Sequence, residues 1–135
     1  MKILVIDGQG GKLGKQLIEA IKENIPAAEI TAVGTNSIAT SAMLKAGAHN
    51  AATGENAVKV NAARADVIAG PLGIVIADSL LGEISPSMAV AVGQSTAKKV
   101  LIPMNKCDNL VAGVSCGTVS ALIDDAVKKI LTLCE

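Results

Sequence analysis

The sequence predicts one α/β domain of Rossmann type, in which a doubly wound, mainly parallel sheet carries helices on both faces. Three observations predict this fold. Short apolar segments alternate with amphipathic ones along the 135 residues, as strands alternate with crossover helices. Half of the residues are apolar while Phe, Tyr and Trp are absent, which suits an aliphatic core of buried parallel strands. Finally, a glycine cluster from Gly8 to Gly14 follows the first apolar segment directly.

The opening segments predict a β-α-β unit. Lys2 to Asp7 is a short apolar run and predicts a strand buried on both faces. Lys12 to Ile25 carries apolar residues at helical spacing and is followed by Pro26, which predicts a helix that stops there. Glu29 to Gly34 then predicts the second strand.

The rest of the chain continues the alternation. The last of these elements is a helix whose apolar residues recur along one face. Oppositely charged pairs four residues apart, such as Asp125 and Lys129, also favour this helix. The predicted elements are a helix over Ser37 to Ala46, a short helix over Thr53 to Val60 that Thr53 caps, a strand over Asp66 to Gly70, a helix over Ser85 to Gln94, a strand over Lys98 to Pro103 and a helix over Val119 to Leu131.

Charge and composition exclude several classes of partner. Lys plus Arg equals Asp plus Glu at 12 each, and no aromatic ring is present for base stacking, so we expect no nucleic acid partner. The longest apolar run, Val67 to Ala77, is too short and interrupted to span a bilayer, so we expect no membrane and a cytoplasmic location. Cys107, Cys116 and Cys134 have neither disulfide nor zinc spacing, and we expect no metal.

The glycine cluster is the most informative segment. Glycines between a strand and a helix bring backbone N–H groups close to a phosphate, and the helix N-terminus adds partial positive charge. The spacing is Gly-x-x-Gly-x-x-Gly through Gly8, Gly11 and Gly14, whereas the strict dinucleotide pattern needs glycine at Leu13. A tight packing turn is the alternative reading. A P-loop is disfavoured, because Gln16 follows where Ser or Thr is needed.

The chain resembles two known families, one through the glycine cluster and one along its whole length. Gly8 to Ile18 resembles the NAD(P)-binding opening of dihydrodipicolinate reductases, although the His-His-x-x-x-Lys substrate motif of that family is missing. Across its length the chain resembles a small bacterial family catalogued as domain of unknown function 3842. The segments that carry this second resemblance are Asp7 to Gly11, Gly34 to Gly47, Ala52 to Ala57 and Ala65 to Gly73. The first resemblance implies NAD(P) or another nucleotide as cofactor, and the second implies no chemistry.

Three further positions complete the candidate site. Thr35 and Asn36 stand where many NAD-binding folds place an acid, and are either ligand donors or a helix cap. Asp7 orients a ligand or caps the loop. Gly70 and Pro71 lie at the end of the predicted strand that begins at Asp66, and either contact a ligand or only form a turn. The predicted cofactor-binding residues are Gly8, Gln9, Gly10, Gly11, Lys12, Gly14, Thr35, Asn36, Gly70 and Pro71.

No catalytic residue is assigned from the sequence. Asn105 to Asp108 includes a thiol, but the single histidine, His49, has no predicted route to it, and we expect His49 on a surface loop. The leading interpretation is a domain that binds a small phosphate-bearing ligand. The alternatives are an NAD(P)-linked oxidoreductase completed by oligomerisation and a structural protein without ligand. The high apolar content also suggests a homodimer.

Overall fold

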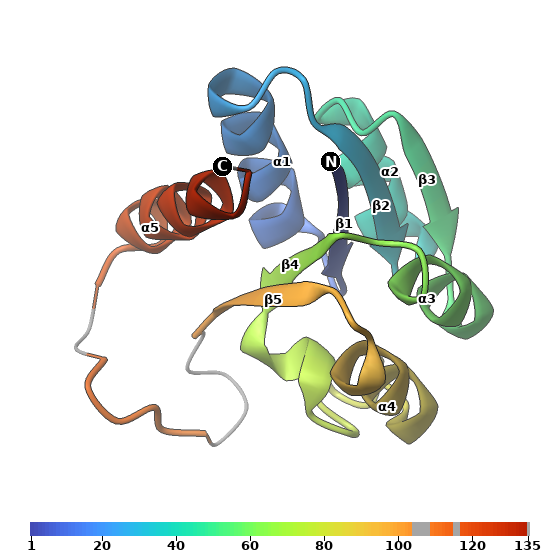
Figure 1. Cartoon of the computed structure of the whole chain (residues 1–135). Helices are drawn as coiled ribbons and strands as arrows, with labels where there is room; N and C mark the ends of the chain where they lie inside the picture. Colours follow the sequence, from blue (N-terminus) through green and yellow to red (C-terminus); the bar gives the residue numbers. More distant parts are fainter. Residues whose placement is uncertain (104–108, 115–116, 135) are drawn as a thin grey trace.

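The computed structural model describes residues 1–103, 109–114 and 117–134, and a five-stranded sheet forms its centre (Figure 1). The strands are β1 (Lys2–Asp7), β2 (Glu29–Gly34), β3 (Asn50–Thr53), β4 (Val67–Pro71) and β5 (Lys98–Ile102). They lie in the order β3-β2-β1-β4-β5, and every neighbouring pair is parallel. The predicted doubly wound α/β fold is therefore confirmed.

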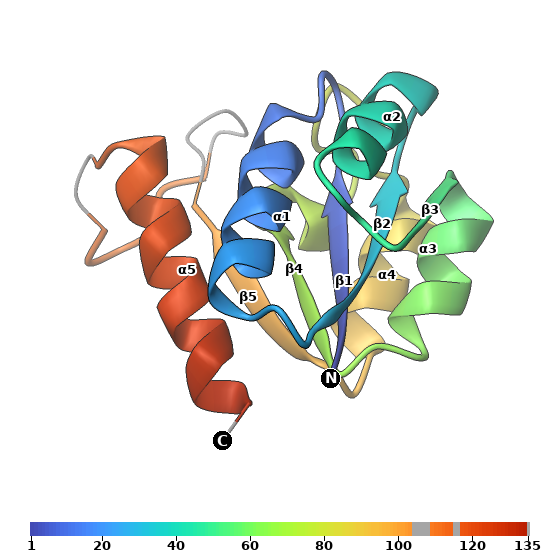
Figure 2. The ribbon, with the colours of Figure 1, turned by 90° about the horizontal axis from the view of Figure 1, so that it is seen from above.

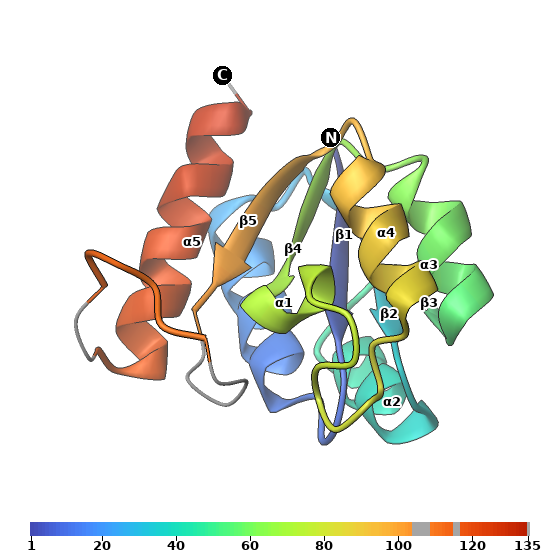
Figure 3. The same cartoon turned by 90° about the horizontal axis from the view of Figure 1, so that it is seen from below.

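The helices cover both faces of this sheet. They are α1 (Lys12–Asn24), α2 (Ser37–Lys45), α3 (Glu55–Ala62), α4 (Pro86–Gln94), α5 (Val119–Leu133) and a short 3-10 helix, η1 (Leu72–Val75). Figure 2 shows α1, α2 and α5 in front of one face, and Figure 3 shows α3 and α4 in front of the other. No helix within the described segments is long and apolar enough to cross a membrane.

The central strand β1 supplies both hydrophobic cores. Successive side chains of a strand point to opposite faces, so Ile3 and Val5 join the cluster under α1, α2 and α5. Leu4 and Ile6 join the cluster under α3 and α4. All four side chains are at most 1% exposed. A strand buried on both faces requires an unbroken apolar run, which is what the sequence has at this position.

The segment around Thr53 differs from the sequence prediction. The chain forms the edge strand β3 over Asn50–Thr53, and α3 begins at Glu55 after Gly54, whose φ is 102°. Thr53 does not cap that helix; its hydroxyl lies 2.7 Å from the hydroxyl of Thr40 in α2. The predicted helix over Thr53 to Val60 is therefore wrong in its start and its cap. The four residues Asn-Ala-Ala-Thr carry no strong strand pattern, and pairing with β2 defines the strand instead.

The strand order places a crevice at the carboxyl end of β1. The chain runs from β1 through β2 to β3 on one side, then crosses to β4 and β5 on the other. Right-handed connections in opposite directions put the intervening helices on opposite faces. The loops after β1 and β4 therefore diverge at this point, which is where open α/β sheets bind ligands.

Candidate functional site

The loop between β1 and α1 is closed by its own backbone. The N–H of Gly11 donates to the carbonyl of Gly8 at 2.9 Å, and Gly11 adopts a left-handed φ of 73°. Gly11 is the N-cap of α1 and offers no side-chain cap. The first N–H groups of the helix must therefore find other partners or remain open.

Asp7, at the end of β1, accepts hydrogen bonds from two backbone N–H groups of this region. Its Oδ1 accepts from the N–H of Gly8 at 2.8 Å, and its Oδ2 accepts from the N–H of Gly14 in α1 at 2.7 Å. Burial raises the pKa of Asp7; the bonds from Gly14 and Gly8 oppose that shift in part, and the charge of Glu83 adds to it. Asp7 thus caps the loop, the second of the two roles considered from the sequence, and both of its oxygens are engaged.

Three backbone donors at the loop remain open. The N–H groups of Gly10, Lys12 and Leu13 make no hydrogen bond to any described residue. They border a hollow of about 300 Å³ lined by residues 7–13 and Pro71. Free N–H groups at a helix N-terminus favour an anion, because the helix dipole adds positive potential there. The exposed side chain of Lys12 adds a formal charge.

The glycines of the loop serve different purposes. A Cβ on Gly14 would lie 2.5 Å from Sδ of Met43 and 2.9 Å from Cβ of Asp7, so this glycine lets α1 pack against α2 and β1. A Cβ on Gly10 would meet nothing within 4 Å. Close packing therefore accounts for Gly14, whereas Gly10 lines the hollow and has no packing constraint of this kind.

Thr35 and Asn36 follow β2 and lie beside the glycine loop. Asn36 caps α2, since its Oδ1 accepts from the N–H of Ala39 at 2.9 Å. Its Nδ2 donates to the carbonyl of Gln9 at 2.9 Å. The helix-cap reading of Asn36 is thus correct, and the same side chain ties the end of β2 to the loop.

Glu83 joins this cluster from the segment between η1 and α4. Its Oε1 accepts from the hydroxyl of Thr35 at 2.6 Å, from Nδ2 of Asn36 at 2.7 Å and from the N–H of Gln9 at 3.0 Å. Burial acts to raise the pKa of Glu83, but these three hydrogen bonds outweigh it and hold the pKa below its usual value. Sequence reasoning did not single out Glu83; the available signal was an acid in the loop after β4, across the crevice.

Gly70 and Pro71 end β4 on the other side of the crevice. Pro71 lines the hollow. A Cβ on Gly70 would collide with the carbonyl oxygen of Ile6 in β1, so this glycine is needed for the close approach of β1 and β4. The fold thus places Pro71 beside the loop and gives Gly70 a packing role.

The remaining sequence candidates lie elsewhere. His49 is exposed next to β3, and its Nδ1 accepts from the N–H of Ile30 at 3.0 Å. The segment Asn105 to Asp108 lies outside the described residues. Cys134 is exposed and unbonded to another cysteine. Across residues 1–103, 109–114 and 117–134, no group of three or more His, Cys, Asp or Glu side chains is arranged to hold a metal ion.

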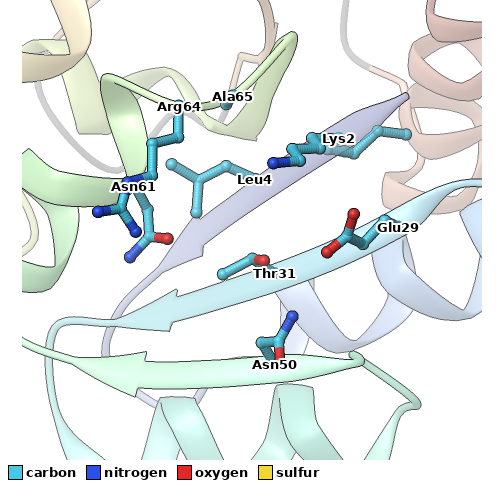
Figure 4. Close-up of a pocket in the computed structure, with 9 residues that line it drawn as sticks. Lys2, Leu4, Glu29, Thr31, Asn50, Asn61, Arg64 and Ala65 are labelled. Atoms are coloured by element: carbon cyan, nitrogen blue, oxygen red, sulfur yellow. The ribbon is translucent and has the colours of Figure 1, made fainter.

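A second hollow, of about 250 Å³, lies at the opposite end of the sheet (Figure 4). None of the residues predicted to bind a cofactor lines it. Its charged side chains, Lys2, Glu29 and Arg64, are exposed and of both signs. It therefore lacks the convergent donors that the glycine loop presents.

Comparisons with known proteins agree with this architecture. A sequence model of the family described as Domain of unknown function (DUF3842) matches residues 2–135. No curated protein matches the chain. Among solved structures, the chain is similar to a dodecameric FMN-dependent Ubix-like decarboxylase from Escherichia coli O157:H7, with a TM-score of 0.53 and 19% identity over 98% of this chain and 93% of that chain. At this identity the likeness concerns the fold alone.

Proposed function

The chain belongs to the family described as Domain of unknown function (DUF3842), and we propose that it binds the phosphate of a nucleotide at the Gly8–Gly14 loop. One observation carries the proposal. The open N–H groups of Gly10, Lys12 and Leu13 lie together at the N-terminus of α1, beside a hollow at the carboxyl end of the sheet. A phosphate oxygen satisfies such donors and gains from the helix dipole.

Charge at the loop supports a phosphate over a neutral group. Lys12 and Lys15 lie in the first turn of α1, and both are exposed. They balance the two carboxylates at the loop, those of Asp7 and Glu83, and the oxygens of Asp7 are already bound to backbone N–H groups of the loop. A phosphate bound at Gly10, Lys12 and Leu13 therefore meets donors that no other described group uses.

The class of ligand follows from the same geometry. A hollow of about 300 Å³ suits one phosphate and its attached sugar rather than a whole dinucleotide. The resemblance of the glycine loop to dihydrodipicolinate reductases implied NAD(P) or another nucleotide as cofactor, and NAD(P) stays a prediction. The Ubix-like decarboxylase is FMN-dependent, and FMN is also a phosphate monoester. This agrees with a mononucleotide as the ligand here.

The proposal is one of binding. Asp7 is buried and each of its carboxylate oxygens accepts a backbone N–H of the loop, so we assign it a structural role as the cap of the loop rather than that of a general base. Binding is therefore the activity that the described side chains at the loop support. Residues Gly8, Gln9, Gly11, Gly14, Thr35, Asn36 and Gly70 shape the site, and Gly10, Lys12, Leu13 and Pro71 face the ligand.

The substitution Gly10→Ala tests the proposal. The added methyl group meets no protein atom within 4 Å, and Gly10 has no left-handed φ, so the fold is expected to persist. Because Gly10 lines the hollow, we expect the methyl group to crowd a phosphate bound at the N–H of this residue. If the crowding moves the phosphate out of reach of one N–H donor, a hydrogen bond to a charged group worth about 1.5–3 kcal/mol is lost, so we expect AMP to bind at least about tenfold more weakly in isothermal titration calorimetry.

Gly93→Ala is the matched control for Gly10→Ala. Gly93 lies exposed in α4, a Cβ there also meets nothing within 4 Å, and the residue is remote in sequence from the loop. We expect the control to bind AMP as the wild-type protein does. Equal AMP affinity of Gly10→Ala and wild type argues against the proposed phosphate site.

A further inference from the structure

The carboxylate of Glu83 lies over the glycine loop and the end of β2. It is held there by the hydroxyl of Thr35, the amide of Asn36 and the backbone N–H of Gln9. Figures 2 and 3 show its segment, between η1 and α4, beside the turn from β1 to α1. Three donors from two separate loops thus converge on one acidic side chain.

The segment that carries Glu83 is held in a costly backbone conformation. Asp78, Leu80 and Leu81 have φ values of 65°, 56° and 56°, in the left-handed region that L-residues avoid. Backbone bonds from Asp78 N–H to the Ile84 carbonyl and from Ile84 N–H to the Ser79 carbonyl hold the turn closed. The buried hydroxyl of Ser79 donates to the carbonyl of Gly73. Such strain persists only where surrounding contacts impose it, and it is concentrated at functional sites.

Only one oxygen of Glu83 is used by these contacts. Oε1 accepts all three hydrogen bonds, and Oε2 accepts none from the described residues. A carboxylate can accept about four hydrogen bonds. Because Glu83 is only partly buried, Oε2 retains capacity for donors from a ligand.

Glu83 does not itself line the hollow of residues 7–13 and Pro71, but its carboxylate lies at the edge of the glycine loop, close to the open N–H of Gly10. Oε1 lies 3.0 Å from the N of Gln9, and Gln9 precedes Gly10, whose N–H is open. Consecutive residues are about 3.8 Å apart, so the carboxylate and the phosphate donor are separated by on the order of 7 Å at most. The ring of a pentose phosphate bridges that distance.

We propose that Glu83 binds the sugar hydroxyls of the ligand whose phosphate occupies the Gly8–Gly14 loop. This inference rests on the proposed phosphate site and names the group attached to that phosphate. In many dinucleotide-binding folds an acid at the end of the second strand holds the ribose. Here that strand ends in neutral residues, Gly34 to Asn36, and the acid reaches the same place from the loop before α4.

The proposal also sets a preference among ligands. A carboxylate accepts hydrogen bonds from hydroxyl groups and repels a second phosphate at the same position. The ligand is therefore a phosphate ester of a sugar whose ring hydroxyls are free.

The test compares ribose 5-phosphate with methyl phosphate, two monoesters of which only the first carries a sugar. Affinities are measured by isothermal titration calorimetry for wild type, Glu83→Gln and Glu83→Asp. We expect both variants to bind ribose 5-phosphate about tenfold more weakly, because a hydrogen bond to a charged acceptor is lost or stretched. Their affinity for methyl phosphate is expected to stay at the wild-type value.

Glu55→Gln is the matched control for loss of charge. Glu55 begins α3 and accepts from the hydroxyl of Ser85 at 2.6 Å, so it neighbours the same segment without touching the glycine loop. If Glu83→Gln binds ribose 5-phosphate as tightly as the wild type or more tightly, the proposal is overturned. The carboxylate then either does not contact the sugar or opposes its binding. If the wild-type protein binds neither monoester, the phosphate site itself is contradicted.

Discussion

Asp7 and Glu83 are two acidic side chains that accept hydrogen bonds from the glycine loop, and their surroundings give them different roles. Asp7 is buried, and each of its oxygens accepts a backbone N–H. Glu83 is partly exposed and uses one oxygen for three donors. Asp7 therefore fixes the loop onto α1, whereas Glu83 has a second oxygen that no described residue uses.

The different environments predict a pH dependence of stability. Burial raises the pKa of Asp7, so the folded protein holds a proton at this carboxyl more tightly than the unfolded chain does. The resulting stability is fully present below the ordinary aspartate pKa of about 4 and is lost as the pH rises through the raised pKa. Urea unfolding, followed by far-ultraviolet circular dichroism at several pH values, measures the free energy of unfolding of wild type and of Asp7→Asn.

We expect wild type to lose stability relative to Asp7→Asn as the pH rises across that window. The comparison of wild type with Glu83→Gln is expected to show the opposite dependence of the free energy of unfolding on pH. Because the pKa of Glu83 is lowered, its contribution is present above the ordinary glutamate pKa of about 4.3 and is lost as the pH falls through the lowered pKa. A wild-type advantage over Asp7→Asn that grows with pH contradicts this account of Asp7.

At the scale of elements, the pairing of β2 with β3 begins with a side chain. The N–H of Ile30 donates to Nδ1 of His49 at 3.0 Å, and the N–H of His49 donates to the carbonyl of Ile30 at 2.9 Å. The imidazole thus extends the ladder by one bond before the first paired residues, Thr31 and Asn50. Nδ1 must be unprotonated to accept this bond.

The contact predicts a cost for His49→Ala. Losing the acceptor leaves the N–H of Ile30 without its partner, and we expect the free energy of unfolding to fall by about 1 kcal/mol. Urea unfolding measures the loss, and hydrogen exchange at Ile30 localises it. Asn50→Ala, which truncates a neighbouring exposed side chain, serves as the control. Exchange at Ile30 that is no faster in His49→Ala than in the control shows that the ring does not support the strand.

The elements that the sequence predicted well are those with strong hydrophobic patterns. β1 is an unbroken apolar run and α1 a clear amphipathic segment followed by Pro26, and both lie within a residue of the predicted bounds. β3 escaped prediction because small and polar residues form it, and its pairing with β2 is a long-range effect. Its neighbour α3 was misplaced for the same reason, since Thr53 belongs to the strand.

Some residues of the candidate site could be predicted from the sequence, and others could not. The glycine spacing and the position of Thr35 and Asn36 after β2 were readable from the sequence, and the fold brings them together. Glu83 was not, because its loop has no periodicity and its placement depends on left-handed φ values at residues such as Leu80 and Leu81. Leucine gives no signal for that conformation in a sequence.

At the scale of the whole molecule, the strand order explains why the site lies where it does. β1 stands between β2 and β4, so the chain leaves the sheet centre in both directions and opens a crevice at the end of β1. Helices on both faces bury the sheet in two aliphatic clusters and leave the carboxyl edge to the loops. The sheet therefore supports the polar groups of three separate connections: the open N–H groups of the glycine loop, the donors of Thr35 and Asn36, and the carboxylate of Glu83.

The most direct test of phosphate binding at the glycine loop is a ¹H–¹⁵N spectrum of the wild-type protein during titration with AMP. We expect the amide resonances of Gly10, Lys12 and Leu13 to shift most, because their N–H groups acquire the phosphate as acceptor. The amide of Gly93 serves as the remote reference. Unmoved loop amides, or shifts confined to the opposite hollow around Asn61 and Arg64, would contradict it.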